Sequence, residues 1–335
     1  MTTTSEPILE VQHLTTRFRT DRGVVTAVDD VSFDLSPGET LGIVGESGCG
    51  KTVTSKSILR LLPEHLSSID KESKVLFRGE NLAHTRERRM RDIRGNHIAM
   101  IFQEPMTSLN PVFTIGWQID EALKYHTKLD RRARRERAIE MLRLVEIPNA
   151  AARIDEYPHQ LSGGMRQRVM IAIALCCEPD ILIADEPTTA LDVTIQAQIL
   201  RLMESLKTRL STAIMLITHD LGVVAQVCDR VLVMYAGRVI ESGPVREIFH
   251  HPQHPYTRAL LDSIPKSGAA EHGARLPSIE GVVPSLFDLP KGCRFQDRCP
   301  RVEDRCRQEE PELGVATEGR NSVRCHFPLS EARKS

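Results

Sequence analysis

A glycine-rich segment near residue 50 contains the residue types that bind phosphate. It is the run Gly45-Glu46-Ser47-Gly48-Cys49-Gly50-Lys51-Thr52, which matches the pattern GxxxxGK[ST]. Successive backbone N–H groups of such a loop curl around the β-phosphate at the positive end of the helix that follows. We expect Lys51 to bridge the β- and γ-phosphates and the Thr52 hydroxyl to complete a Mg²⁺ shell. The segment therefore predicts a site for a nucleoside triphosphate and Mg²⁺.

The remaining positions of this loop have simpler requirements. Glycine is expected at 45, 48 and 50 because a Cβ would block the backbone torsions or the close approach of phosphate. Cys49 stands where a small side chain suffices, so it either packs inside the loop or provides a redox-sensitive thiol beside bound phosphate. We favour packing, because no neighbouring residue in the sequence indicates an activated thiolate.

The elements around the loop are those that a phosphate site needs. Val31, Phe33 and Leu35 alternate with polar residues, as in a half-buried strand. A Ser-Pro-Gly turn then leads to the short apolar strand Leu41–Val44, and residues 52–62 are predicted to form a helix. Strand, glycine loop and helix in this order give the pattern its mechanistic meaning.

A pair of carboxylates follows a second apolar strand. Asp185 and Glu186 come directly after Ile181–Ala184. Asp185 would orient Mg²⁺ through a water ligand, and Glu186 could polarise the water that attacks the γ-phosphate. Further buried strands are predicted at residues 213–218 and 231–235, as in a parallel sheet covered on both faces.

Three motifs in this order resemble the ATP-binding-cassette (ABC) ATPases. They are the phosphate loop, the run Leu161-Ser162-Gly163-Gly164-Met165-Arg166-Gln167-Arg168, and the run Asp185-Glu186-Pro187-Thr188-Thr189-Ala190-Leu191-Asp192. The resemblance covers about residues 8–250. It implies an α/β fold: an ABC-type P-loop nucleotide-binding domain with a RecA-like core, an antiparallel β subdomain and a helical subdomain at about 84–178. It also implies a dimer, in which Ser162, Gly163 and Gly164 close over ATP held by the partner and Asp192 lies at the interface.

The resemblance extends to three isolated residues. Gln103 matches the glutamine that contacts Mg²⁺ and the transmembrane partner, and His219 matches the histidine that senses the γ-phosphate. For the aromatic residue that stacks on adenine, only Phe18 and Phe33 precede the loop. Phe33 belongs to the apolar face of its strand, so Phe18 is the candidate, and a π-face would tolerate GTP as well as ATP.

The middle of the chain changes character. Ile139, Leu142 and Val145 recur at helical spacing at the end of a very basic stretch. The charge run at residues 131–135 could bind phosphate or nucleic acid, but the solvated face of a helix explains it more simply. A looser linker is expected at about 265–290.

The end of the chain resembles the ATP-binding subunits of dipeptide and oligopeptide importers. The matching runs are Glu104–Pro111, His251–Leu261 and Gly281–Pro284. The chain would then divide into an ABC ATPase domain (1–250) and a C-terminal region of the importer type (251–335). The resemblance implies a second ABC ATPase, two transmembrane permeases and an external solute-binding protein. A heterodimer is favoured, although both half-sites are intact and a homodimer stays open.

Other ABC proteins fit the sequence less well. Those that act on ribosomes usually carry two cassettes in one chain, and DNA-repair types interrupt the cassette with long coiled coils. Exporters often fuse the cassette to membrane spans. An importer ATPase for a non-peptide solute, such as nickel or glutathione, remains an alternative because the ATPase subunit does not touch the cargo.

Four of the eight cysteines lie in the last fifth of the chain. Their spacing is Cys293-x5-Cys299-x6-Cys306-x18-Cys325. Structural zinc sites generally contain tight C-x₂₋₄-C pairs, which are absent here. Four thiolates on an irregular segment can instead hold a [4Fe–4S] cluster, and the importer resemblance implies one. We expect the cluster, with zinc as the second choice and free thiols as the third; His326 could substitute as a ligand.

Composition limits the compartment and the partners. The formal net charge of −1 gives no reason to expect nucleic acid as a partner. The first residues lack the basic and apolar regions of a signal peptide, and no apolar run approaches the ~18 residues of a membrane span. We therefore expect a cytosolic chain, and the resemblance to importers implies that it is a peripheral protein at the cytoplasmic face of the inner membrane.

Overall fold

The structure is a computed structural model that describes residues 6–103, 108–189, 192–264, 279–315 and 321–329. Part of the segment 104–111 and much of the expected linker lie outside these residues. The chain forms two compact units, which are described separately. Unit 1 contains residues 1–8, 35–40 and 84–217, and unit 2 contains residues 9–34, 41–83 and 218–335.

Unit 2 contains a five-stranded sheet in which β2, β1, β5 and β6 are neighbours in that order and β4 pairs with β1. Its strands are β1 (Leu9–Thr20), β2 (Gly23–Leu35), β4 (Ser67–Ile69), β5 (Lys74–Phe77) and β6 (Glu80–Asn81). The pairs of β1 with β4 and β5 are antiparallel. The alternation at Val31, Phe33 and Leu35 is confirmed, because all three side chains are buried in β2.

A second group of strands in unit 2 leads to the phosphate loop. In order they are β12 (Gly314–Val315), β13 (Ser322–Val323), β11 (Arg238–Pro244), β10 (Arg230–Tyr235) and β3 (Thr40–Val44). β3 and β10 run parallel, and β10 and β11 form an antiparallel hairpin. Helix α1 (Lys51–Ile58) begins directly after the loop, with Gly50 as its N-cap.

Helix α1 is shorter than the sequence predicted. The expected helix ran to Leu62, whereas α1 ends at Ile58. Arg60 adopts a left-handed backbone with φ of 49°, a conformation that an α-helix cannot continue. The local apolar pattern through Leu59, Leu61 and Leu62 did not reveal this change of direction.

Unit 1 contains three parallel strands, β7 (Ile98–Ile101), β8 (Ile181–Asp185) and β9 (Ala213–Ile217), with β8 in the middle. Every residue of β8 and β9 is buried. This burial explains why both strands are continuous apolar runs. Strand β7 lies within residues 84–178, so this stretch is not entirely helical.

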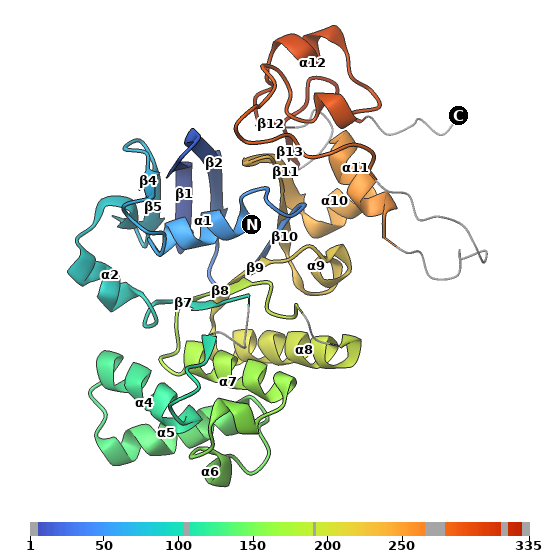
Figure 1. Ribbon diagram of the computed structural model, residues 1–335. Coiled ribbons are helices and arrows are strands. Elements are labelled where there is room, and N and C mark those ends of the chain that lie inside the picture. Colours follow the sequence, from blue (N-terminus) through green and yellow to red (C-terminus); the bar gives the residue numbers. More distant parts are fainter. Residues whose placement is uncertain (1–5, 104–107, 190–191, 265–278, 316–320, 330–335) are drawn as a thin grey trace. The chain divides into compact units, whose positions relative to one another are not determined.

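Most of the middle of the chain is a group of helices, coloured green in Figure 1. They are α4 (Ile115–His126), α5 (Arg131–Leu144), α6 (Ala150–Arg153) and α7 (Gly163–Leu175), with the 3₁₀ turn η2 (Pro158–Gln160) before α7. Unit 1 also contains α2 (Glu87–Ile93) and α8 (Val193–Leu210). The basic run lies on α5, where Arg132, Arg134 and Arg135 pair with carboxylates. Arg132 and Arg135 are exposed, which agrees with a solvated helix face, whereas Arg134 is largely buried in its pair with Asp120.

The end of the chain in unit 2 packs as part of that unit's core. Its helices are α9 (Leu221–Val227), α10 (Val245–His250), α11 (Pro255–Asp262) and α12 (Asp304–Gln308), and the 3₁₀ turn η3 forms at Gln296–Arg298. Another 3₁₀ turn, η1 (Leu82–His84), directly follows β6 earlier in the chain. One apolar cluster contains Val44 at the end of β3, Tyr235 of β10, Tyr256 of α11 and Phe295 beside η3. The strand before the phosphate loop therefore shares a core with residues more than 200 positions later.

Candidate functional site

The phosphate loop of unit 2 has the backbone that its glycines predicted. Gly45 has a φ of 151°, and a Cβ on it would lie 2.3 Å from the Met234 carbonyl oxygen. Gly50 has a φ of 105°, and a Cβ there would lie 2.6 Å from the Ala27 carbonyl oxygen. No side chain fits at either contact, so both positions require glycine. Ser47 and Gly48 form the exposed tip of the loop.

Lys51 is buried at the centre of this loop. Its Nζ donates to the carbonyl oxygens of Gly45 at 2.7 Å and Glu46 at 3.0 Å. The ammonium group is thus held where a loop of this type receives phosphate. Thr52 follows it in the first turn of α1.

Cys49 behaves as a packing residue. Its side chain is buried, and this burial raises the pKa of the thiol despite the nearby Lys51. The thiol is therefore neutral at physiological pH, which agrees with the packing role expected from the sequence and not with an activated thiolate.

Glu46 is bound by residues from the end of the chain. Its carboxylate forms a bidentate ion pair with Arg298, and its backbone N–H donates to the Tyr256 hydroxyl at 3.0 Å. Neither Tyr256 nor Arg298 was among the residues expected at the site.

The acidic pair of unit 1 lies where the sequence predicted. Asp185 is the buried last residue of β8, and Glu186 follows it. Glu186 adopts a left-handed backbone with φ of 48°, which is uncommon outside glycine and is frequent at functional sites. The Glu186 Oε2 atom accepts hydrogen bonds from Gln103 Nε2 and from the Thr189 hydroxyl, each at 2.9 Å. Unit 1 therefore brings Gln103 and Glu186 together.

The segment beginning at Ser162 starts helix α7. The Ser162 side chain is the N-cap and accepts from the Met165 N–H at 3.4 Å, while Gly163 and Gly164 form the first turn. Gln167, one turn into the helix, is buried and donates to the Pro187 carbonyl oxygen at 2.5 Å. This bond links the start of α7 to the residue after Glu186. Gln167 belongs to the run that resembles the ABC motif, but the sequence analysis assigned it no role.

Three other expected residues have clear local positions. Asp192 is the N-cap of α8 and accepts from the Ile195 N–H at 2.9 Å. His219 is exposed and directly precedes Asp220, the N-cap of α9. Phe18 is half-buried on β1, whereas Phe33 is buried, as expected. Two residues before Phe18, the Thr16 hydroxyl bonds to Ser57 of α1 at 2.8 Å, so β1 lies against the helix that follows the phosphate loop.

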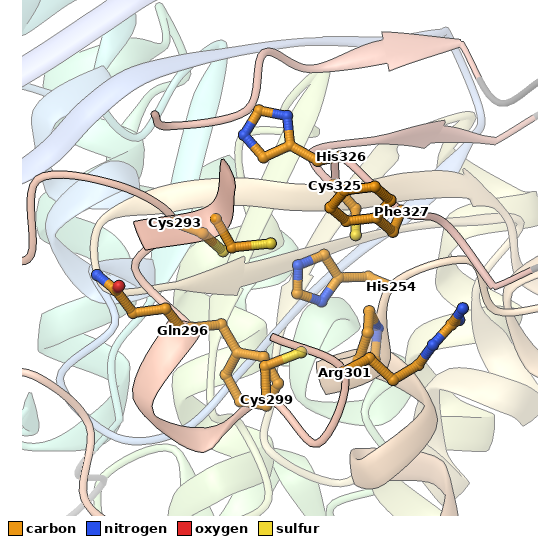
Figure 2. Close-up of a pocket in the computed structure, with 11 residues that line it drawn as sticks. His254, Cys293, Gln296, Cys299, Arg301, Cys325, His326 and Phe327 are labelled. Atoms are coloured by element: carbon orange, nitrogen blue, oxygen red, sulfur yellow. The ribbon is translucent and has the colours of Figure 1, made fainter. Parts of the chain in front are cut away.

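The four C-terminal cysteines line one pocket, together with His254 and His326. Figure 2 shows the sulfur atoms of Cys293, Cys299 and Cys325 directed toward the same space. Burial raises the pKa of Cys293 to about 12 and that of Cys325 to about 11. Among the residues that the structure describes, no group of three or more His, Cys, Asp or Glu side chains is placed to hold a single metal ion. Cysteine thiolates are the residue type that ligates iron–sulfur clusters, and all four line this pocket.

Two family models match the chain. One, described as "ABC transporter", matches residues 28–189, and the other, "Oligopeptide/dipeptide transporter, C-terminal region", matches residues 240–306. The dipeptide transport ATP-binding protein DppD of Escherichia coli is 50% identical over 325 residues, which cover 97% of this chain and 98% of the relative. The chain belongs to the ABC transporter ATP-binding proteins.

Other members of this ABC family agree with that assignment. DppD of Bacillus subtilis is 52% identical over 96% of this chain and 94% of the relative. A probable peptide ABC transporter ATP-binding protein, y4tR of Sinorhizobium fredii, is 54% identical over 93% of this chain and 92% of the relative. Among solved structures, the dimeric ABC transporter cassette MJ0796 aligns with a TM-score of 0.63 and 28% identity, covering 71% of this chain and 99% of that chain.

These findings confirm the ABC fold and the ATPase activity expected from the motifs. They also confirm the resemblance of the C-terminal region to oligopeptide and dipeptide transporters. In the part of the chain that the structure describes, no helix is both long and apolar enough to cross a membrane.

Proposed function

We propose that the chain is the ATP-hydrolysing subunit of a membrane importer that takes up dipeptides or oligopeptides. The main support is the 50% identity to E. coli DppD, a dipeptide transport ATP-binding protein, over 97% of this chain. The match of residues 240–306 to the oligopeptide/dipeptide transporter C-terminal region supports the same solute class independently of the ATPase motifs. An ABC protein that acts on ribosomes or nucleic acid would not need this region.

In this proposal the loop residues bind the nucleotide. Lys51 and the backbone from Ser47 to Thr52 hold the β- and γ-phosphates, and Phe18 stacks on adenine. Thr52, Asp185 and Gln103 would hold Mg²⁺, which would screen the phosphate charge.

Hydrolysis is assigned to residues that follow strands β8 and β9. Glu186 orients the attacking water and accepts its proton, and the hydrogen bonds from Gln103 and Thr189 fix the position of its carboxylate. His219 senses the γ-phosphate. Ser162, Gly163 and Gly164 at the N-terminus of α7 stabilise the partner's γ-phosphate, since a helix N-terminus favours anions. Asp192 lies at the dimer interface.

The assembly follows from the importer class. We propose a second ABC ATPase as dimer partner, two permeases and an external solute-binding protein, with this chain at the cytoplasmic face of the inner membrane. Residues 1–250 would form the ATPase domain, with its helical subdomain at about 84–178, and residues 251–335 the importer-specific region.

We further propose that Cys293, Cys299, Cys306 and Cys325 hold a [4Fe–4S] cluster. The support is that all four line one pocket and that their spacing lacks the tight pairs of zinc sites. When bound, such a group would cross-link a segment with little regular structure. Anaerobic purification followed by assays of iron, acid-labile sulfide and zinc tests this. Stoichiometric zinc without sulfide would contradict it.

Uptake of a labelled dipeptide by cells of the native host tests the function. We expect uptake to be lost when the gene is deleted, restored by the wild-type chain and not restored by Lys51→Ala. Uptake of a free amino acid in the same cells is the control. Dipeptide uptake that does not change on deletion would exclude dipeptides, and a tripeptide to pentapeptide series would then test oligopeptides.

The partners are tested by trapping the closed dimer. Tagged Glu186→Gln protein, held with ATP and Mg²⁺, should retain two permeases and a second ATPase from detergent-solubilised membranes. Recovery of ribosomes or of DNA-repair factors instead would exclude the importer.

A further inference from the structure

The phosphate loop is held in place by residues from the end of the chain. The contact is at Glu46, the second residue of the loop. Arg298 Nη1 donates to its Oε2 atom at 2.6 Å and Nη2 donates to its Oε1 atom at 3.0 Å. The Glu46 N–H donates to the Tyr256 hydroxyl at 3.0 Å. These partners follow Glu46 by 252 and 210 positions.

All five N–H groups of Arg298 have acceptors. Besides the two bonds to Glu46, Nη1 donates to the Tyr235 hydroxyl at 3.4 Å, Nε donates to the Glu280 carbonyl oxygen at 3.0 Å and Nη2 donates to the Ile279 carbonyl oxygen at 3.2 Å. The Arg298 side chain is only 3% exposed. The two bonds to Glu46 form a bidentate, charge-assisted pair. A lysine could not reproduce this fork of donors.

Tyr256 is fixed equally well. It is fully buried, and its ring lies 4.8 Å from that of Tyr235 and 5.4 Å from that of Phe295, measured between centroids. Burial raises the pKa of its hydroxyl, so the group remains neutral and can accept from the Glu46 N–H. The position of this acceptor is therefore set by the core and not by the loop.

Every polar group of Glu46 consequently has a partner. Its N–H bonds to Tyr256, its carboxylate to Arg298, and its carbonyl oxygen accepts from Lys51. Lys51 is the residue expected to contact phosphate. Arg298 and Tyr256 are therefore linked to it through Glu46.

A second arginine, Arg294, contacts a segment that is hydrogen-bonded to the loop. Arg294 Nη1 donates to the Ala236 carbonyl oxygen at 2.5 Å and also pairs with Asp29. Next to Ala236, the Gly237 N–H donates to the Cys49 carbonyl oxygen at 3.0 Å. Arg294 and Arg298 lie at the two ends of one short segment that includes η3.

We propose that Arg298 is a positioning residue of the nucleotide site: with Tyr256 it fixes Glu46, and thereby the loop conformation that binds the β-phosphate. The inference rests on the ATP site of the ABC family and not on the transported solute or on a metal. It gives the C-terminal region a role in nucleotide binding.

The test measures nucleotide affinity of the purified full-length chain by isothermal titration calorimetry. Arg298→Met keeps the length of the side chain but removes the charge and the donors. We expect ATP and ADP to bind at least about tenfold more weakly, equivalent to about 1.4 kcal/mol, because both nucleotides carry the β-phosphate. Turnover at saturating ATP should change by less than about twofold, so that the effect appears in KM and not in kcat.

Three further variants separate positioning from general destabilisation. Arg305→Met is the control, because exposed Arg305 pairs with Glu309 and not with the loop; its affinities should equal those of the wild type. Arg298→Lys should recover only part of the affinity. In a Glu46→Gln background, Arg298→Met should cause little further loss, because both changes break the same pair.

Tyr256→Phe provides an independent test if Arg298→Met does not fold. It keeps the buried ring, removes only the acceptor for the Glu46 N–H and should weaken ATP and ADP binding about threefold or more. Wild-type affinity for both nucleotides in folded Arg298→Met, or in Tyr256→Phe if the former does not fold, would overturn the proposal.

Discussion

Glu186 has an uncommon backbone conformation and accepts two hydrogen bonds at one carboxylate oxygen. Its backbone is left-handed, and its Oε2 atom accepts from both Gln103 and Thr189. A strained backbone costs of order 1–3 kcal/mol and persists where the surrounding structure fixes it. The direction of this side chain is thus set by the backbone as well as by its hydrogen bonds.

Glu186→Gln should keep this geometry and remove the group that accepts a proton. We expect kcat for ATP hydrolysis to fall about 10²- to 10⁴-fold with little change in ATP affinity, measured by phosphate release and by calorimetry. Thr189→Val, which removes only one donor to Glu186, should have a much smaller effect. Wild-type turnover in Glu186→Gln would show that another residue accepts the proton.

Cys49 should react slowly with thiol reagents. Burial raises the pKa of its thiol, whereas hydrogen bonding to Cys176 lowers the pKa of Cys177. Because its pKa is raised, the Cys49 thiol is less ionised at neutral pH. Alkylation of Cys49 therefore begins only at higher pH. Iodoacetamide labelling at pH 7, followed by peptide mass spectrometry, should modify Cys177 before Cys49. The opposite order would indicate an activated Cys49.

At the scale of elements, the phosphate loop makes different demands on its glycines. A Cβ at Gly45 meets the Met234 carbonyl oxygen, whereas at Gly48 no atom lies within 4 Å and only the positive φ of 79° opposes a side chain. The first position is limited by space and the second by backbone conformation alone.

Gly48→Ala should therefore destabilise the chain by about 1–2 kcal/mol, the cost of a left-handed backbone. Gly45→Ala should cost at least about 1 kcal/mol more, because overpacking adds to that strain. Urea unfolding without nucleotide compares the two. Equal losses would mean that β10 moves to make room beside Gly45.

The sequence predicted those elements whose pattern lies in consecutive residues. The strand, loop and helix around Lys51 and the strand before Asp185 were predicted from short runs, because torsion angles and burial leave their pattern in neighbouring residues. The predicted end of α1 was wrong, because no pattern in the neighbouring residues indicates that Arg60 is left-handed.

The residues that hold Glu46 could not be predicted in this way. Arg298 is one of 44 Lys and Arg residues, and it lies 252 positions from the loop residue that it contacts. The neighbouring Cys299 belongs to the cysteine pattern, which indicated a metal site and not a nucleotide site. Tyr256 lies in a run whose resemblance to importers was recognised, but that resemblance did not indicate what its hydroxyl contacts.

At the scale of the whole molecule, the C-terminal region belongs to the core that supports the phosphate loop. Phe295 is buried against Tyr235 and Tyr256, and its cluster includes Val44 at the end of β3. We therefore expect unit 2 not to be stable without this region.

Phe295→Ala should destabilise the chain by about 3–5 kcal/mol, because it leaves a cavity among buried aromatic rings. Phe295→Leu, which fills more of the space, should cost clearly less, and exposed Phe287→Ala should cost little. Thermal and urea unfolding measure all three. A small loss in Phe295→Ala would show that the tail packs only loosely.

The long separation between Glu46 and Arg298 has a consequence for biosynthesis. The loop leaves the ribosome early, but the arginine that completes its contacts is made 252 residues later, a delay of roughly 12–50 s at ordinary rates of bacterial translation. During that time the nascent chain contains a phosphate-binding sequence without its finished support. Translation of the last residues would then complete the support of the nucleotide site, so that an incomplete chain would bind ATP more weakly than the finished protein.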